Sequence, residues 1–172
     1  MRFRTTRELC YLAGVMDDYR PPDKSYVGVR TRSDELVQRF VKFALLLGAD
    51  PRKILIEEAG EVKHAYFYHS RIARMIREVL ERKASLPRRS RELAACLVAG
   101  ALDSKGFVDE RGVRFSRLDK ADGLMLEMLG IHTRNGKVMN IGALASLIGK
   151  ESLLAAGISK VSAHAEKSSQ RI

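Results

Sequence analysis

Basic side chains concentrate between residues 71 and 91, where their chemistry would be the binding of phosphate groups. This stretch holds eight Lys and Arg residues against Glu78 and Glu81, so it carries six of the ten net positive charges of the chain. The eight are Arg71, Arg74, Arg77, Arg82, Lys83, Arg88, Arg89 and Arg91. A surplus of this size indicates a polyanionic partner, either nucleic acid or an acidic membrane surface. A solvated helix face followed by a soluble linker explains the same charges equally well.

Three aromatic side chains form a second candidate group. His64, Tyr66 and Tyr68 occupy alternate positions, so they share one face of a predicted strand. Rings arranged in this way can stack on unpaired bases, as they do in proteins that bind single strands or RNA. Packing within the sheet is at least as good an explanation.

A nine-residue segment occurs twice in the chain. Residues 10–18 read Cys-Tyr-Leu-Ala-Gly-Val-Met-Asp-Asp, and residues 96–104 read Cys-Leu-Val-Ala-Gly-Ala-Leu-Asp-Ser. Their spacing places the small residues and the first aspartate of each copy on one helix face. We therefore predict that two equivalent helices pack backbone against backbone along a seam. The predicted seam residues are Cys10, Ala13, Gly14, Asp17, Cys96, Ala99, Gly100 and Asp103.

The elements around these two helices repeat in the same order. The alternation from Tyr26 to Arg32 predicts a strand, and Ser33 and Gly48 bound a helix. Further predicted elements are strands at 53–58 and 62–69, a helix capped by Ser70, strands at 106–110 and 113–118, a short helix that stops at Gly130, an Asn135-Gly136 hairpin and a helix at 143–156. The fold class is therefore α+β, a pseudo-two-fold duplicated αββαββα unit with a shortened second repeat. The expected domains are residues 1–84, a basic linker at 85–91, residues 92–158, and a polar tail at 159–172.

Composition narrows the class of protein. The chain has 172 residues and is 45% hydrophobic, enough for a sizeable core, so a wholly disordered chain is excluded. No apolar run approaches the roughly 18–20 residues of a membrane helix, and the first residues lack an apolar signal core. We expect a cytoplasmic protein without a membrane partner. The two cysteines, Cys10 and Cys96, are too few for a disulfide framework, and no Cys/His spacing resembles a zinc site.

The two segments from Leu12 to Asp18 and from Val98 to Gly106 resemble the paired motifs of the LAGLIDADG homing endonucleases. The resemblance covers about residues 7–157 and is to the single-chain members, which carry both motifs in one chain. It therefore implies a monomer with internal pseudo-symmetry. In that family the residue five positions after the motif glycine is acidic. The two acids, one from each half, hold divalent metal against the scissile phosphates of duplex DNA.

This chain departs from the family at both acid positions, which are occupied by Tyr19 and Lys105. The resemblance therefore predicts that no catalytic residues and no metal site remain, with Asp18, Asp17 and Asp103 as the fallback carboxylates. The family glycine after the first acid is replaced by Arg20, and Pro21 and Pro22 disrupt the first strand of that half. We expect no cofactor, with Mg²⁺ required only if cleavage survives.

In the family, nucleic acid lies against the strand faces opposite the core. The residues predicted to contact it are Arg20, Tyr26, Arg30, Arg32, Arg114, Ser116, Arg134 and Lys137, joined from the basic stretch by Arg71, Arg74, Arg82, Lys83, Arg88 and Arg89. We expect a repurposed binder of duplex DNA or of structured RNA. A structured RNA target would place the protein within a ribonucleoprotein. The alternatives are an active metal-dependent endonuclease that cuts duplex DNA, and a protein-interaction module that retains only the scaffold.

Overall fold

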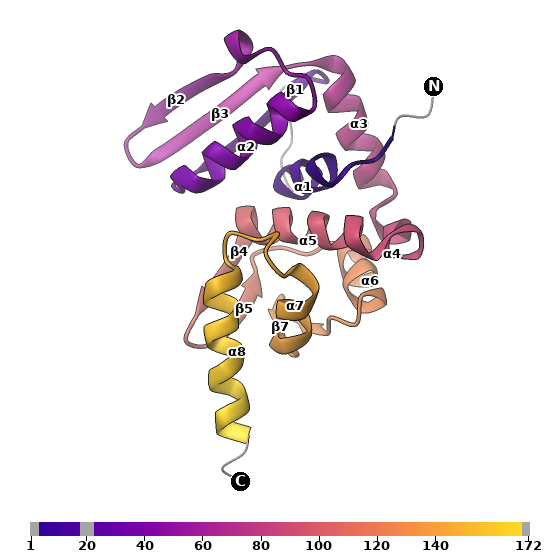
Figure 1. Cartoon of the computed structure of the whole chain (residues 1–172), viewed down its shortest axis with the longest axis vertical. Coiled ribbons are helices and arrows are strands. Elements are labelled where there is room, and N and C mark those ends of the chain that lie inside the picture. Colours follow the sequence, from indigo (N-terminus) through magenta and orange to yellow (C-terminus); the bar gives the residue numbers. More distant parts are fainter. Residues whose placement is uncertain (1–3, 18–22, 170–172) are drawn as a thin grey trace.

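The structure, a computed structural model, describes residues 4–17 and 23–169. Two helices form its centre: α1 (Arg7–Met16) and α5 (Arg91–Lys105). Figure 1 shows them side by side, with one sheet above the pair and a second sheet below it. Most residues of both helices are buried, because each helix is covered by its own half and by the other helix.

The first half surrounds a three-stranded antiparallel sheet in the order β1-β3-β2. Its elements are β1 (Tyr26–Thr31), α2 (Asp34–Leu46), a 3-10 turn (Pro51–Lys53), β2 (Leu55–Ala59), β3 (Val62–Tyr68) and α3 (Ser70–Glu81). The apolar residues of β1 and β3 that face α2 and α3 are buried, and they build the core of this half.

The second half surrounds a four-stranded antiparallel sheet in the order β4-β5-β7-β6. Its elements are β4 (Gly106–Asp109), β5 (Gly112–Phe115), α6 (Lys120–Met128), β6 (Thr133–Arg134), β7 (Lys137–Val138) and α7 (Ile141–Ile148). The fold class is thus mixed α+β, as predicted, and it contains two small antiparallel sheets.

The two sheets share a pairing pattern. In the first half β1, the strand before α2, pairs with β3, and β3 pairs with β2. In the second half β5, the strand before α6, pairs with β7, and β7 pairs with β6. The second half is shorter: α6 has 9 residues where α2 has 13, and α7 has 8 where α3 has 12. The segment that holds Pro21 and Pro22 lies outside the described residues.

Most elements lie where local sequence signals predicted them. Ser33 caps α2 by accepting a hydrogen bond from the Leu36 amide, and the chain leaves this helix through Gly48 at φ +92°. Asn135 and Gly136 both adopt positive φ, as the predicted two-residue hairpin requires. One cap was mispredicted: α3 begins at Ser70, and the side chain of His69 accepts the capping bond.

The linker and the C-terminal region differ from prediction. The predicted linker is mostly helical, with a 3-10 turn (Lys83–Ser85) and α4 (Leu86–Arg89) before α5. The predicted helix at 143–156 is wrong, because α7 stops at Gly149, whose φ is +47°. A new helix, α8 (Ala155–Ser169), then follows, so residues 159–169 of the expected polar tail lie within a helix. Buried Ile158 anchors α8 to the second half, and the C-terminal part of α8 extends away from it (Figure 1).

Candidate functional site

The seam between the halves is built on two glycines. A methyl group placed on Gly14 would collide with the backbone oxygen of Leu97, and one on Gly100 would collide with that of Tyr11. Gly100 follows Gly14 by 86 residues, and Leu97 follows Tyr11 by the same number, so the two contacts are equivalent. The predicted seam is therefore confirmed as a close approach of two backbones.

The remaining small residues of the seam are buried as predicted. Ala13, Ala99 and both cysteines are at most 1% exposed. Burial raises the pKa of the Cys10 thiol to about 12 and that of Cys96 to about 11, so both thiols are protonated at neutral pH. Cys10 packs as a small apolar group, whereas the Cys96 thiol also donates a hydrogen bond to the Glu151 carboxylate at 3.8 Å.

At the end of α5, Asp103 is held by uncharged donors. Its carboxylate accepts hydrogen bonds from the Tyr11 hydroxyl, the Ser152 hydroxyl and the Leu153 amide. One guanidinium nitrogen of Arg39 lies 3.7 Å away. Burial, followed by the negative charge of Asp103, raises the pKa of Tyr11, so its hydroxyl stays a donor. Asp103 therefore ties α1 and the segment after α7 to α5.

At the end of α1, Asp17 is instead held by two ammonium groups. The Lys83 Nζ lies 2.7 Å from one carboxylate oxygen, and the Lys105 Nζ lies 2.9 Å from the other. The three side chains are 3%, 5% and 8% exposed. Lys105 is the residue at the family's second acid position, so a cation of the protein itself lies where the resemblance expects a metal-binding carboxylate.

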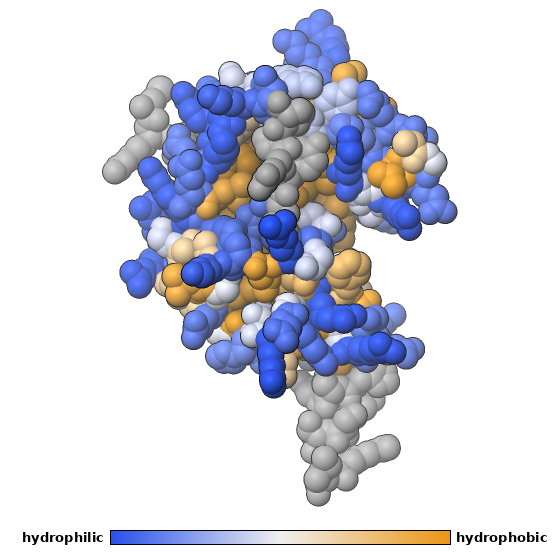
Figure 2. All heavy atoms as spheres, turned by 180° about the vertical axis from the view of Figure 1, so that it is seen from behind, coloured by the Kyte–Doolittle hydropathy of each residue, from blue (hydrophilic) through white to orange (hydrophobic). Residues whose placement is uncertain are grey.

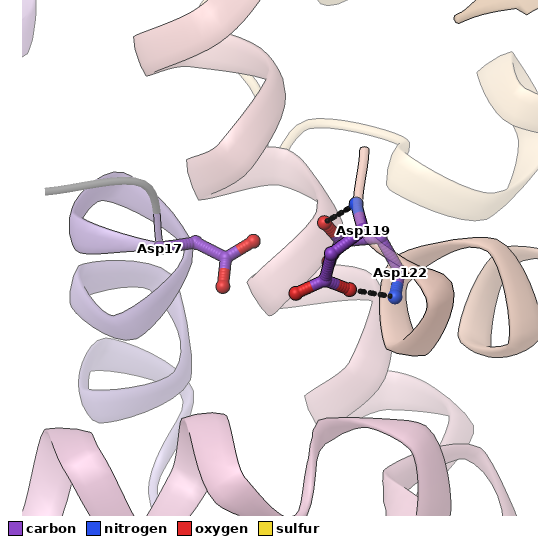
Figure 3. A group of neighbouring side chains, drawn as sticks. All are labelled: Asp17, Asp119 and Asp122. Carbon is purple, nitrogen blue, oxygen red and sulfur yellow. Dashed lines mark hydrogen bonds between the residues drawn. The ribbon is translucent and has the colours of Figure 1, made fainter. Parts of the chain in front are cut away.

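Two aspartates at the start of α6 complete this group. The Lys83 Nζ lies 2.8 Å from Asp119 and 2.7 Å from Asp122, so its three N–H donors meet three different carboxylates. Asp119 and Asp122 also bond to each other's backbone amides, which caps α6. Figure 3 shows Asp17 pointing from α1 toward this pair. We call Asp17, Lys83, Lys105, Asp119 and Asp122 the lysine–aspartate cluster.

The charges of the cluster do not balance, since three carboxylates meet two ammonium groups. Burial raises the pKa of Asp17, but hydrogen bonds from Lys83 and Lys105 outweigh it, so its pKa is lowered overall. Burial, followed by the charge of Asp17, raises the pKa of Asp122. Burial opposes the charge of Lys83, yet its carboxylate partners raise its pKa. Asp122 is therefore the member that takes up a proton most readily as the pH falls.

Oxygens of Asp17, Asp119 and Asp122 lie within 4.8 Å of one another, a spacing that could suit a divalent cation. However, the ammonium of Lys83 already contacts all three carboxylates. A metal ion would have to displace this buried cation or be repelled by it. Lys83 therefore occupies the place that a metal ion would need, and the cluster forms an ion network that is buried except at Asp119, whose side chain is 59% exposed.

A second candidate surface lies on the outer face of the second sheet. The strand register sets Arg114 opposite Phe107 on one side and Lys137 on the other, and Lys137 opposite Arg134. All four are exposed, whereas neighbouring Val113 and Phe115 point into the core. Three predicted contact residues thus form one row, and Ser116 is exposed just beyond β5. Asp109 partly offsets the charge of Arg114, at 3.4 Å.

The outer face of the first sheet fits the prediction less well. Arg30 and Arg32 are exposed, with Glu61 lying 3.7 Å from Arg32. Tyr26, predicted as a contact residue, is only 2% exposed, because its ring lies over Gly28 and its hydroxyl bonds to His64. His64 stacks on Tyr66, and Tyr66 stacks on Tyr26, so these rings face one another. His64 and Tyr66 therefore each use a ring face within the sheet, whereas Tyr68 is 52% exposed and makes only edge contacts with Tyr26 and Tyr66.

The basic stretch divides into two parts. Arg71, Arg74, Arg82, Arg88 and Arg89 are exposed, as predicted for a charged surface. Lys83 is the exception, since it is 4% exposed and belongs to the lysine–aspartate cluster, so its prediction as a surface contact is wrong. Figure 2 shows hydrophilic residues over most of one face of the molecule, interrupted by hydrophobic patches. Asp18, Tyr19 and Arg20 lie outside the described residues.

Sequence reasoning missed Asp119 and Asp122. Their spacing of three residues before an apolar helix is a capping signal, but that signal is local and names no partner. No signal in the sequence relates them to Asp17 or Lys83.

No family model matches this chain, and no curated protein matches it either. Among the described residues, no helix combines the length and apolar character needed to cross a bilayer.

Proposed function

We propose that this protein is a LAGLIDADG-type scaffold that binds nucleic acid through the outer faces of its sheets and does not cut it. The support for the scaffold is the glycine seam at two equivalent helices, with the same strand pairing in both halves. A single-chain scaffold of this kind needs no second subunit to complete its pseudo-symmetry.

The observation that carries the binding proposal is the row of Arg114, Lys137 and Arg134. Three cations in register across a sheet offer a series of contacts to successive phosphates, and Phe107 at the end of the row adds a ring 57% exposed. The net charge of +10 adds a long-range attraction for any polyanion.

A salt titration tests this proposal. We expect Kd for duplex DNA or a structured RNA to rise with salt, and Arg114→Glu with Lys137→Glu to flatten that dependence by about one unit of slope per cation removed. Lys42→Glu, an exposed change of the same charge on α2, is the matched control and should have little effect. Comparing the two nucleic acids identifies the preferred one. An affinity independent of salt, or an equal loss in the control, would refute the binding surface.

The lack of cleavage rests on Lys83 and Lys105, whose ammonium groups contact the carboxylates of the cluster. The observation that favours the alternative, an active endonuclease, is the close spacing of the Asp17, Asp119 and Asp122 oxygens. Incubation with Mg²⁺ or Mn²⁺ and a library of intron-insertion sites decides between them. Specific cuts that Asp17→Asn or Asp18→Asn abolishes would establish the endonuclease. Co-purification free of nucleic acid with an acidic protein would instead favour an interaction module.

A further inference from the structure

Aromatic side chains gather on the outer face of the first sheet. His64, Tyr66 and Tyr68 alternate along β3 and share this face, whereas Phe67 between the last two is buried on the core side. The strand register sets Tyr26 of β1 directly opposite Tyr68, so its side chain belongs to the same face. The first half therefore presents an aromatic surface.

Three of these side chains are packed on one another. Tyr66 stacks on Tyr26, with ring centroids 6.0 Å apart, and on His64, with centroids 4.5 Å apart. The hydroxyl of Tyr26 is hydrogen-bonded to His64, and that of Tyr66 donates to Glu57. Gly28 makes room for this packing, because a methyl group there would lie 2.1 Å from the hydroxyl oxygen of Tyr26. The three rings thus hold one another in place.

Tyr68 is the exception among the four. Its ring stands at 75° to that of Tyr26 and at 89° to that of Tyr66, so neither ring stacks on it. Its side chain is supported by these two contacts and is still 52% exposed. A flat aromatic surface on a supported strand is therefore open to a ligand.

Exposed cations lie around Tyr68. Arg30 is exposed on the same face, about 13 Å from Tyr68 along the strands. Lys24 comes just before β1 and Arg71 just after β3, and both are exposed. Since the start of β1 pairs with the end of β3, these two cations lie at the same end of the sheet as Tyr68. A nucleic acid that reached Tyr68 would find phosphate contacts on either side of the ring.

The chemistry of this face suits an unpaired base. In a duplex, the base pairs present their edges in the grooves, and their faces are covered by the neighbouring pairs. An unpaired base has a free face, and stacking on aromatic side chains is a common way for proteins to bind it. The second sheet instead presents the row of Arg114, Lys137 and Arg134, which suits phosphates. The two sheets therefore fit different parts of a nucleic acid.

We propose that Tyr68 is a stacking site for an unpaired base, an inference that rests on the proposed binding of nucleic acid. The class of ligand is then a duplex that carries an unpaired segment. The row of cations on the second sheet contacts the backbone of the paired part, and Arg30, Lys24 and Arg71 contact the phosphates beside the stacked base. RNA and DNA share this chemistry, so the test uses both.

A comparison of two probes tests the stacking site: a blunt duplex, and the same duplex with a short single-stranded extension, each made in RNA and in DNA. Tyr68→Ala should weaken binding of the extended probe at least about fivefold and leave the blunt probe unchanged. Tyr68→Phe, which keeps the ring, should bind both probes as the wild type does. Leu124→Ala, a truncation of a side chain 51% exposed on α6, is the matched control and should affect neither probe.

Fluorescence of 2-aminopurine placed in the extension gives a second measurement that uses the wild type. Stacking quenches this base, so its signal should fall on binding, and Tyr68→Ala should reduce the fall. If Tyr68→Ala does not fold, as thermal unfolding would show, Tyr68→Leu replaces it. Binding of both probes that Tyr68→Ala weakens equally, or not at all, would overturn the stacking site alone. Failure of the wild type to bind any probe would overturn the proposed function as well.

Discussion

Asp17 and Asp103 occupy equivalent positions in the two halves, yet they are held in different ways. Asp103 accepts hydrogen bonds from uncharged groups, the hydroxyls of Tyr11 and Ser152 and the amide of Leu153, and its one cation, Arg39, lies farther away at 3.7 Å. Asp17 forms ion pairs with Lys83 and Lys105. The middle of the seam, in contrast, is alike in both halves, since Gly14 and Gly100 make equivalent contacts.

The reason for the difference is one residue on the opposite helix. Tyr11 supplies a hydroxyl to Asp103, but the residue equivalent to Tyr11 in the second half is Leu97, which has no donor. Asp17 therefore needs other partners, because a buried carboxylate without one is strongly destabilising. Close backbone packing allows only glycine at positions 14 and 100, so the two halves are alike there. A buried carboxylate can be stabilised by hydrogen bonds or by ion pairs, so the two halves can differ at Asp17 and Asp103.

Removing Lys83 should have the largest effect on this comparison. Lys83→Met leaves three aspartates with Lys105 alone, and we expect it to lower the free energy of unfolding by about 3–5 kcal/mol. Urea unfolding measures this loss. Lys120→Met, an exposed change on α6, should cost little. Equal costs for the two variants would show that the cluster is not a buried network.

The glycines test the part of the seam that both halves share. Gly14→Ala and Gly100→Ala should each lower the free energy of unfolding by about 1–3 kcal/mol, because the added methyl group meets backbone atoms that can yield only if the helices separate. Gly123→Ala is the control: its added methyl has open space within α6, so it should stabilise by about 0.5–1 kcal/mol. If Gly14→Ala and Gly100→Ala lowered the free energy of unfolding by very different amounts, the two glycine contacts would not be equivalent.

Tyr11→Phe tests the uncharged side of the comparison. It removes one of several donors to Asp103 and should cost about 1–2 kcal/mol, less than the loss of Lys83. Chemical denaturation of Tyr11→Phe and Lys83→Met in parallel compares the unfolding free energy that each variant loses. A cost for Tyr11→Phe as large as that of Lys83→Met would mean that Asp103 depends on its hydroxyl partner alone.

The pH dependence of stability should show the smallest effect, and Asp17 and Asp122 contribute to it with opposite sign in different pH ranges. The lowered pKa of Asp17 contributes stability that is present above the usual aspartate value of 3.8 and is lost as the pH falls below it. The raised pKa of Asp122 makes the fold gain stability as the pH falls through that raised pKa toward 3.8. Asp122→Asn should remove this gain, so that its unfolding free energy no longer rises on acidification. Identical pH profiles for the wild type and Asp122→Asn would contradict the assignment.

The elements that sequence reasoning placed correctly are those with local signals. The Ser33 cap, the exit from α2 at Gly48 and the Asn135-Gly136 hairpin depend on a few neighbouring residues, and all three are present. The seam was also predictable, because small residues at helical spacing leave a backbone open to close contact. The break at Gly149 was missed, since an isolated glycine in an apolar run does not reveal whether the helix continues.

Lys83 shows where such reasoning fails. Its neighbours in sequence are basic and exposed, so pattern and composition both assigned it to the surface. Its burial depends on Asp17, Asp119 and Asp122, which lie 36 to 66 residues away along the chain. Tyr26 is a similar case, because its burial depends on the aromatic rings of β3.

The sequence by itself determined the repeat, the order of most elements, the two glycines that let the central helices touch and the excess of positive charge. These follow from residue type and spacing, which act over one or two turns of helix or one hairpin. Only the tertiary structure decided which charges are paired in the interior and which are aligned on a surface. Electrostatic partners are chosen by distance in space, and the folded chain sets that distance.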